Sequence, residues 1–207
     1  MGNNITYTQS PFNKTRKDKF LMVMNIPLAL RQIATKFERT AETILPDTLQ
    51  FSVYGTVIPD ISVPAIQTRY GGQTLSHTSH SREPYPPINV NFTVDNRFNN
   101  YWVIYTWLDM LNNSADGLYD SKQLTAPTRS TVNNGVNSSF YQYKSTISIF
   151  GLDEYDKRVI EFKYTDAFPS AIGGINYSYR DAGEVESSFT LNYSQLLISP
   201  LTETENQ

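Results

Sequence analysis

The sequence contains no cysteine among its 207 residues, which excludes disulfide bonds, zinc–thiolate sites and thiol nucleophiles. Charged residues make up only 18% of the chain and sum to a net charge of −3, so the overall charge would not recruit nucleic acid through its phosphates. The longest apolar run, residues 20–30, is too short to cross a bilayer, and residues 1–19 lack the apolar core of a signal peptide. We therefore expect no membrane anchor.

Sequence motifs for catalysis and cofactor binding are also missing. The chain has no phosphate-binding loop motif, no dinucleotide-binding glycine motif and no serine in a G-x-S-x-G context. The acidic residues Asp153, Glu154 and Asp156 fall in a predicted hairpin turn, where carboxylates are ordinarily solvated. We therefore expect no catalytic residue and no cofactor, and we interpret the chain as a protein that is not an enzyme.

The two histidines, His77 and His80, are the one candidate for a metal site. A metal ion would need further ligands, which Glu83 or Asp60 could supply. Their spacing matches no metal-binding motif, so the sequence favours a solvated or interface loop and no metal.

The composition and the hydrophobic pattern favour β-structure. Asn, Ser, Thr, Tyr and Gln take the place of the missing charges, and this mix suits strands and polar loops better than a helical bundle. Alternating apolar positions predict strands over residues 20–26, 51–57, 88–94, 140–149, 160–164, 175–179 and 189–193. The regular spacing of the turns predicts an antiparallel β-sandwich or barrel with one or two flanking helices.

Two segments change to helical periodicity. Residues 28–44 carry an apolar stripe with a proline near each end. The second segment follows the strand at 88–94, where Asp95 or Asn96 can cap a helix whose apolar stripe runs to Leu111. Because burying one large aromatic side chain stabilises a fold by about 2–3 kcal/mol, we expect this aromatic-rich helix to anchor the core.

These elements predict a single domain over residues 20–199. An N-terminal arm at 1–19, with a basic cluster, precedes it, and a polar tail at 200–207 follows it. Two long polar loops, 71–87 and 112–139, interrupt the domain. Loops longer than about 15 residues are usually functional or disordered, so both are candidates for contacts with other molecules.

Three segments, in this order and spacing, resemble the tail tube proteins of contractile-tailed bacteriophages, a family that includes baseplate tube-initiator subunits. The first is "VIPDISVPAIQTRYGG", which runs into the first polar loop. The second is "EPYPPINVNFTVDNRFNNYWVIYTWLDML", a strand followed by an acidic residue and a helix. The third is "IEFKYTDAFPSAIGGINYSYRDAGEVESSFTLNYSQL", a terminal unit of strands, a loop and a polar turn. The resemblance covers residues 51–199.

The resemblance implies a structural subunit that forms hexameric rings, which stack into a hollow tube inside a contractile sheath. It implies as partners further copies of the chain and the sheath, baseplate and tail-terminator proteins. The tape measure protein and DNA would pass through the lumen without sequence-specific binding. It places the protein in the virion tail, assembled in the host cytoplasm, and implies no catalytic residue, metal or cofactor.

In such a tube, we expect the first polar loop and the residues before it to contact another subunit. The predicted contact residues are Arg69, Tyr70, His77, His80, Arg82 and Glu83. The predicted helix at 28–44 and the loop at 112–139 look like additions to a compact tube subunit, so a main tube protein and an initiator ring protein both remain open. A β-sandwich binding module, for example for carbohydrate, is the alternative from another functional class.

Overall fold

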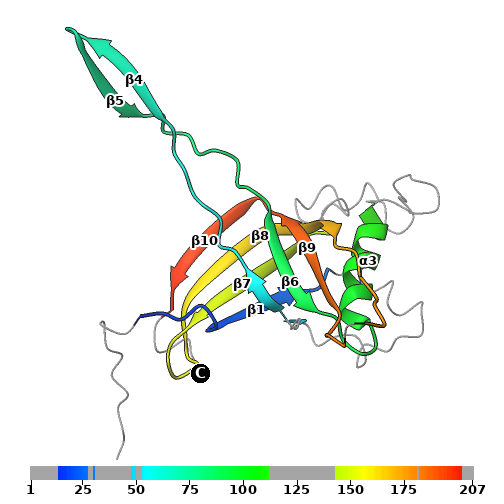
Figure 1. Cartoon of the computed structure of the whole chain (residues 1–207). Coiled ribbons are helices and arrows are strands. Elements are labelled where there is room, and N and C mark those ends of the chain that lie inside the picture. Colours follow the sequence, from blue (N-terminus) through cyan, green and yellow to red (C-terminus); the bar gives the residue numbers. More distant parts are fainter. Residues whose placement is uncertain are drawn as a thin grey trace, which may run out of the picture.

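The computed structural model describes residues 14–27, 30, 48–49, 53–111, 143–180 and 182–201 (Figure 1). The predicted helix at 28–44, apart from Leu30, and the predicted loop at 112–139 lie outside the described residues. The same holds for most of the N-terminal arm and for the tail after Leu201.

The described part of the chain is mainly antiparallel β-structure, which confirms the predicted fold class. One helix, α3 (Asn99–Leu111), lies among these residues. The strands are β1 (Phe20–Asn25), β2 (Thr48–Leu49), β3 (Val53–Thr56), β4 (Ala65–Tyr70), β5 (Gln73–Thr78), β6 (Ile88–Thr93), β7 (Ser145–Leu152), β8 (Arg158–Ile172), β9 (Glu186–Asn192) and β10 (Gln195–Pro200). Eight of them form one sheet in the order β2-β1-β7-β8-β9-β6-β3, with β10 paired to β8, while β4 and β5 pair separately.

Strand β8 belongs to two layers of this sheet. Its first part lies between β7 and β10, and its last part, from Phe168 to Ile172, pairs with β9. Between the two parts, Asp166 has a φ of 55° and the register with β7 shifts, so the strand bends there. We call the two layers the β10 layer (β2, β1, β7, the first part of β8, and β10) and the β9 layer (the last part of β8, β9, β6 and β3). The curvature is visible in Figure 1.

The hydrophobic core lies on the inner faces of these layers. Strands β6 and β9 alternate between buried and more exposed residues, as their sequence pattern predicts. Phe92 from β6 and Phe189 from β9 meet edge to face, with ring centroids 5.6 Å apart. Met24 and Ile147 contribute to the same core from the β10 layer, and both are fully buried.

Helix α3 anchors the core, as predicted. Its buried residues include Val103, Ile104, Trp107 and Met110. The indole Nε1 of Trp107 donates a hydrogen bond to the backbone oxygen of Tyr143, 2.7 Å away. The helix is therefore tied both to the core and to the segment that leads into β7.

The junction between β6 and α3 uses polar residues that the sequence singles out. The Asp95 carboxylate oxygen Oδ1 accepts hydrogen bonds from the backbone N–H groups of Arg97 and Asn99, at 3.0 and 2.7 Å. Asn100 is buried, and its Nδ2 donates to the backbone oxygen of Thr93 at 2.9 Å. The predicted capping role of Asp95 is confirmed, although the helix itself begins at Asn99.

The prediction of a strand over residues 175–179 is wrong. The chain is irregular from Gly173 to Glu184 where it is described, and β8 instead continues through residues 165–172, which the sequence pattern assigned to a loop. The bend at Asp166 and the register shift between Pro169 and Ala171 let a proline lie in this strand. The alternating tyrosines after Gly174 have no neighbouring strand in the described part of the chain, and they are exposed to solvent.

The prediction of an irregular loop over residues 71–87 is also wrong in part. Residues 73–78 form β5, which pairs with β4 in full register from Ala65↔Thr78 to Tyr70↔Gln73. Gly71 and Gly72 both have positive φ, at 59° and 81°, as a two-residue type I′ hairpin turn requires. The sequence pattern also gave no separate strand for residues 195–200, which form β10.

Candidate functional site: a protruding finger and exposed sheet surfaces

The most prominent feature of the molecule is a long projection, which we call the finger, formed by residues 57–87. It consists of the β4–β5 hairpin and two connecting legs, 57–64 and 79–87 (Figure 1). Every residue of β4 and β5 is exposed. The hairpin lies well away from the sheet, so none of the other described elements covers either of its faces.

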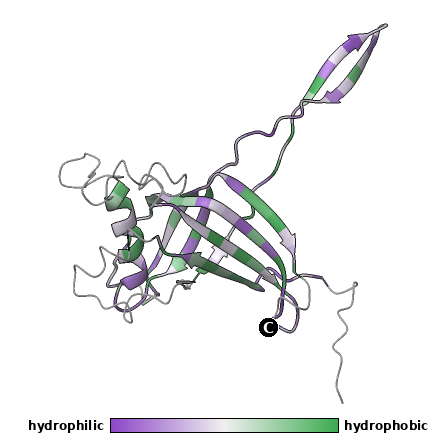
Figure 2. Cartoon of the chain, turned by 180° about the vertical axis from the view of Figure 1, so that it is seen from behind, coloured by the Kyte–Doolittle hydropathy of each residue, from purple (hydrophilic) through white to green (hydrophobic). Residues whose placement is uncertain are grey.

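The two faces of the hairpin carry different kinds of side chain, and the cross-strand pairing determines which residues share a face. The pairs Ile66↔His77, Thr68↔Leu75 and Tyr70↔Gln73 share one face, and the intervening pairs share the other. Figure 2 shows apolar and polar positions on both strands. The exposed fractions of Ile66, Tyr70 and Leu75 are 54%, 76% and 42%, so one face carries three large solvent-exposed apolar side chains.

The legs of the finger are held together near the hairpin. The backbone N–H of Ser79 donates to the oxygen of Pro64 at 3.0 Å. Further toward the body, the Ser62 hydroxyl donates to a carboxylate oxygen of Glu83 at 2.8 Å. These bonds keep the legs side by side, so the hairpin is presented on a two-stranded stalk.

An aromatic cluster fixes the base of the finger to the body. The Tyr193 ring lies 5.5 Å from that of Tyr85 and 4.9 Å from that of Tyr164, centroid to centroid. The Tyr193 hydroxyl donates to the backbone oxygen of Pro86 at 3.1 Å, and Arg82 Nη1 donates to the Tyr85 hydroxyl at 2.7 Å. The direction of the finger is therefore set by contacts with the turn between β9 and β10.

Two phenols of this cluster, those of Tyr193 and Tyr164, are held in their protonated form. Burial, and after it the neighbouring Tyr85, raises the pKa of Tyr193 to about 12. Burial, and after it Tyr193, also raises the pKa of Tyr164, whose hydroxyl oxygen is buried without a hydrogen-bond partner in the described part of the chain. An unsatisfied buried hydroxyl is unusual and costs stability.

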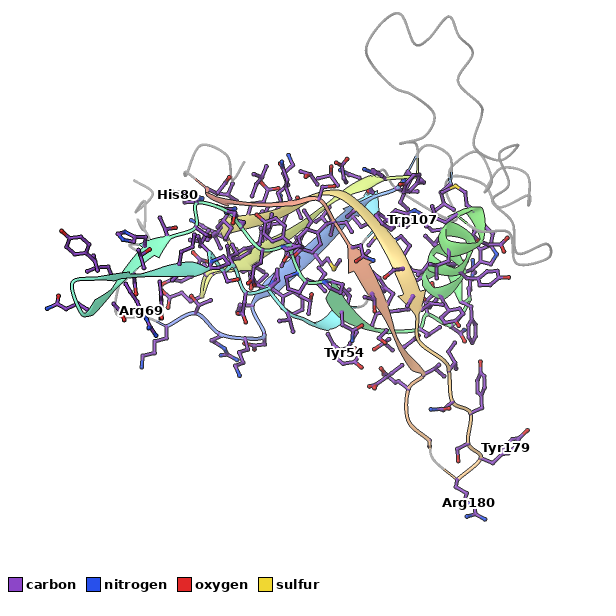
Figure 3. All side chains as sticks on the ribbon, turned by 90° about the horizontal axis from the view of Figure 1, so that it is seen from above. Tyr54, Arg69, His80, Trp107, Tyr179 and Arg180 are labelled. Atoms are coloured by element: carbon purple, nitrogen blue, oxygen red, sulfur yellow. The ribbon has the colours of Figure 1, made fainter. Side chains whose placement is uncertain are left out.

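All six residues that the sequence predicts as contacts lie on the finger, but they differ in their surroundings. Tyr70 and His77 share the apolar face of the hairpin, and Arg69 lies on the opposite face. Arg82 and Glu83 already bond to Tyr85 and Ser62 within the chain. His80 lies in the leg after β5, with a φ of 55° (Figure 3).

The two histidines do not form part of a metal cluster in the described residues. No group of three or more histidine, cysteine, aspartate or glutamate side chains there is arranged to hold a metal ion. Nor does any helix among these residues have the length and apolar character needed to cross a membrane.

The sequence pattern missed a second exposed surface, the loop between β8 and β9. The exposed fraction of Tyr177 is 74%, and the side chain of Tyr179 is fully exposed. Figure 3 shows Tyr179 and Arg180 at the end of this loop, which leaves the body in a different direction from the finger. The loop starts at Gly173, where an added Cβ would lie only 2.9 Å from the Ser188 hydroxyl, so the close approach to β9 requires glycine.

The central parts of the outer faces of the two layers differ in whether they carry charged side chains. On the β9 layer, the outward residues of β6 and β9 are neutral and polar between the pairs Asn89↔Thr190 and Asn91↔Ser188. On the β10 layer, Glu161 and Lys163 face outward, and the Glu161 carboxylate accepts a 2.6 Å hydrogen bond from the Ser148 hydroxyl. Each layer also ends in an edge: among the described strands, β3 pairs only with β6, and β10 pairs only with β8.

A cavity of about 350 Å³ lies at the end of the β10 layer away from the finger. Leu152, Val159 and Ile160 form its apolar part, and its charged rim includes residues from the segment 14–19 and from the β7–β8 turn. Strand β10 connects the two regions. Tyr193, just before it, bonds to the base of the finger, and Leu201, just after it, donates its N–H to the Val159 oxygen at 2.9 Å beside the cavity.

This architecture matches a known family along almost the whole chain. The phage tail tube protein family matches residues 15–199. The chain belongs to this family. No curated protein sequence matches this tail tube protein significantly.

Solved structures with the same fold come from contractile injection machines. The sheath–tube complex of the extracellular contractile injection system PVC in its extended state has a TM-score of 0.55 at 10% identity, over 94% of this chain and 100% of that chain. The tube-terminating cap of the anti-feeding prophage has a TM-score of 0.55 at 14% identity, over 96% and 99%. The anti-feeding prophage baseplate, symmetrised six-fold, has a TM-score of 0.50 at 11% identity, over 93% and 97%. At these identities the likeness concerns the fold.

Family membership gives this molecule its role as a structural subunit of a phage tail tube. It agrees with the sequence-based interpretation of the chain as a structural protein and favours that interpretation over a β-sandwich binding module.

Proposed function

We propose that copies of this tail tube protein form hexameric rings, and that the rings stack into a hollow tube inside a contractile sheath. The finger is the single observation that carries this proposal. A chain that extends a fully exposed two-stranded hairpin on a stalk gains little stability from it alone, because isolated hairpins are marginal in water. Its use lies in contact with another subunit.

The strand edges supply the contact that closes a ring. Strands β3 and β10 each have one side without a strand partner among the described residues, and such edges pair readily with another chain. A contact between different edges of neighbouring copies is heterologous, and it forms a ring if the rotation closes. Similarity to a baseplate solved with six-fold symmetry supports six copies as the number that closes.

The β9 layer is suited to line the lumen. Its outer face between Asn89 and Thr190 carries amide and hydroxyl groups and no basic residue, so phosphates passing it would meet no fixed positive charge. We propose that the tape measure protein and DNA pass along this face without sequence-specific binding. The partners outside the lumen are the sheath, the baseplate and the tail terminator, and the assembled tube resides in the virion tail after assembly in the host cytoplasm.

An initiator ring at the baseplate is the second candidate. It is favoured by the similarity to the anti-feeding prophage baseplate structure, although the sheath–tube complex matches with a higher TM-score. The copy number in the virion distinguishes the two functions, because an initiator forms one ring and a main tube protein forms many.

The main experiment removes the hairpin and leaves its stalk. Pro64 and Ser79 already share a hydrogen bond, so two glycines in place of residues 65–78 can join them without strain on the body. We expect the purified wild type to form hollow tubes in negative-stain electron microscopy, and the variant to remain folded by circular dichroism without forming tubes. Normal tubes from the variant would remove the finger from the assembly mechanism. Absence of rings and tubes from the wild type at high concentration, even with a baseplate template, would contradict the proposed function itself.

A further inference from the structure

Strand β10 is held in place by few side-chain contacts. Among the described strands it pairs only with β8, so its other edge has no strand partner there. Leu196 is its one buried residue, whereas the side chains of Leu197 and Ile198 are each 46% exposed. An edge strand with a single buried side chain opens locally at a low cost in free energy, so its order depends on the contacts at its ends.

One end of β10 is held by the aromatic cluster at the base of the finger, which consists of Tyr85, Tyr164 and Tyr193. Tyr193 precedes the strand by two residues. Its ring packs edge to face on that of Tyr164, with centroids 4.9 Å apart, and Tyr164 is the cross-strand partner of Leu196. A movement of the Tyr193 ring therefore reaches the buried residue of β10 through one neighbour.

The same cluster holds the finger through a stiff segment of chain. The Tyr193 hydroxyl donates to the Pro86 oxygen at 3.1 Å, and the Tyr193 ring lies 5.5 Å from that of Tyr85. Residues 84, 86 and 87 are prolines, whose rings fix the backbone φ. Because a proline-rich segment is semi-rigid, a change in the direction of the finger would displace Tyr85 and Pro86 instead of bending this leg.

The hydrogen bonding of the cluster is incomplete in this arrangement. The Tyr164 hydroxyl oxygen is buried and has no hydrogen-bond partner in the described part of the chain. Since a buried unpaired hydroxyl costs free energy, a small movement of the Tyr193 ring that lets this hydroxyl bond would recover part of that cost. The cluster thus has a physical reason to adopt a second arrangement.

We propose that Tyr193 is a positioning residue that couples the finger to strand β10: when another subunit holds the finger, the aromatic cluster is fixed and the edge of β10 is ordered for pairing. This inference rests on the tube assembly proposed above and adds to it a link between the two contacts of each subunit. By thermodynamic linkage, order in β10 also fixes the direction of the finger. A subunit held by its finger then closes a ring more readily than a free one.

Hydrogen exchange of β10 in the unassembled protein tests the coupling from the side of the finger. Tyr193→Phe keeps the ring and removes the bond to Pro86, and Tyr85→Ala changes only the finger side of the cluster. In both variants we expect the amides of residues 195–199 to exchange at least about threefold faster than in the wild type, while those of β7 keep their wild-type rates.

Ser62→Ala is the matched control on the same finger. It removes the 2.8 Å hydrogen bond to Glu83 in the stalk and leaves the aromatic cluster intact, so we expect wild-type exchange in β10. Wild-type rates in Tyr85→Ala would overturn the coupling. Equal acceleration by Ser62→Ala and Tyr85→Ala would remove the cluster from it, and equal acceleration of β7 and β10 would reduce Tyr193 to a general structural role.

Spin labels test the coupling from the side of β10, because a chain without cysteine can be labelled at chosen sites. Ser76→Cys on the finger and Ser170→Cys on β8, both exposed, report the distance between finger and body by pulsed electron paramagnetic resonance. We expect Leu196→Ala, at the buried position of β10, to widen the distribution of this distance. Leu197→Ala, on the exposed face of the same strand, should leave it unchanged. Equal distributions in the two variants would contradict the link from β10 to the finger.

The consequence for assembly is measured by negative-stain electron microscopy. We expect Tyr193→Phe to raise the protein concentration needed for tubes by at least about fivefold, because each subunit loses the link between its two contacts. Asp95→Ala destabilises the body without touching the aromatic cluster, so it should leave that concentration unchanged. Equal effects of the two variants would sink the coupling. If the wild type forms neither rings nor tubes, the proposed function fails, whereas the exchange and distance measurements still decide the coupling in the unassembled subunit.

Discussion

Two antiparallel strand pairs in this molecule each carry apolar side chains on one face, but that face is buried in one pair and exposed in the other. In the β6–β9 pair, Phe92 and Phe189 face inward and are buried against α3 and the β10 layer. In the β4–β5 pair, Tyr70 and Leu75 also share one face, yet both side chains are exposed. One-sided hydrophobicity therefore predicts that a strand pair will be covered, but it does not say whether the cover comes from the same chain.

The two pairs should respond in opposite ways to substitution, and the largest effect is expected in the body. Trp107 is fully buried, and its indole nitrogen bonds to the Tyr143 oxygen. We expect Trp107→Ala to lower the free energy of unfolding by about 3–5 kcal/mol in urea denaturation. Tyr70→Ala, on the finger, should change it by less than about 0.5 kcal/mol in the monomer. A large loss from Tyr70→Ala would mean that the finger contributes to the folding of its own chain. If Trp107→Ala does not fold, Trp107→Phe provides a milder version of the same measurement.

A smaller effect is expected where β6 continues into α3. Asp95→Ala removes the acceptor for two backbone N–H groups at the start of the helix. The expected loss is about 1 kcal/mol in the free energy of unfolding, within a range of about 0.5–2 kcal/mol for lost caps. Asn96→Ala changes an exposed neighbour and serves as the control. Equal stabilities of the two variants would show that the Asp95 bonds add nothing to the body.

The joint between finger and body can be tested with two conservative substitutions. Tyr193→Phe removes the hydrogen bond to the Pro86 oxygen and should cost about 0.5–1.5 kcal/mol. Tyr164→Phe removes a buried hydroxyl with no partner among the described residues and should leave stability unchanged or raise it. Thermal or urea denaturation of both variants measures the difference. A loss of stability from Tyr164→Phe as large as that from Tyr193→Phe would mean that the Tyr164 hydroxyl has a hydrogen-bond partner after all.

The proton on the Tyr193 hydroxyl, in the same joint, should affect stability only in alkaline solution and not at neutral pH. A tyrosine in the unfolded chain titrates near pH 10, whereas burial raises the pKa of Tyr193 in the folded protein to about 12. The folded state thus holds this proton more tightly, so the stability that it contributes is complete below about pH 10 and is lost as the pH rises toward about 12. Tyr164, whose pKa is also raised, acts in the same direction.

We therefore expect the free energy of unfolding to fall between about pH 10 and pH 12, and Tyr193→Phe to make this fall shallower. If Tyr193→Phe has the same pH dependence as the wild type, the proton held at Tyr193 does not contribute to stability in this range.

The sequence predicted the β6–α3 unit well because its signals are local. Apolar alternation through Phe92, a capping carboxylate at Asp95 and a helical stripe that includes Trp107 all agree within one short stretch. Consistent local signals of this kind leave few alternatives. The core positions of β9 were predictable for the same reason.

Sequence-based strand prediction failed where the pattern within a segment and the presence of a partner strand point to different structures. Tyr177 and Tyr179 alternate as strand residues do, but no strand among the described residues lies beside them, and both are exposed. Pro169 argues against a strand, yet it lies buried in β8 where the ladder shifts register. Pairing partners decide both cases, and periodicity in one segment carries no information about them.

The six predicted contact residues show the same division between sequence and structure. All six lie on the finger, and their contact with another subunit stays a prediction. Only the pairing register of β4 and β5 separates Tyr70 from Arg69, since neighbouring residues of a strand point to opposite faces. The sequence pattern likewise could not predict the hydrogen bonds that Arg82 and Glu83 make with Tyr85 and Ser62.

By itself, the sequence determined that this chain is a β-protein with a helix-anchored core and without thiol chemistry, because periodicity and composition are properties of single segments and of the residue set. Only the tertiary structure decided that one hairpin stands away from the core and keeps its apolar face exposed. The physical reason is that burial depends on which distant segments pack together. The sequence of residues 65–78 carries no information about whether other segments of the chain pack against this hairpin.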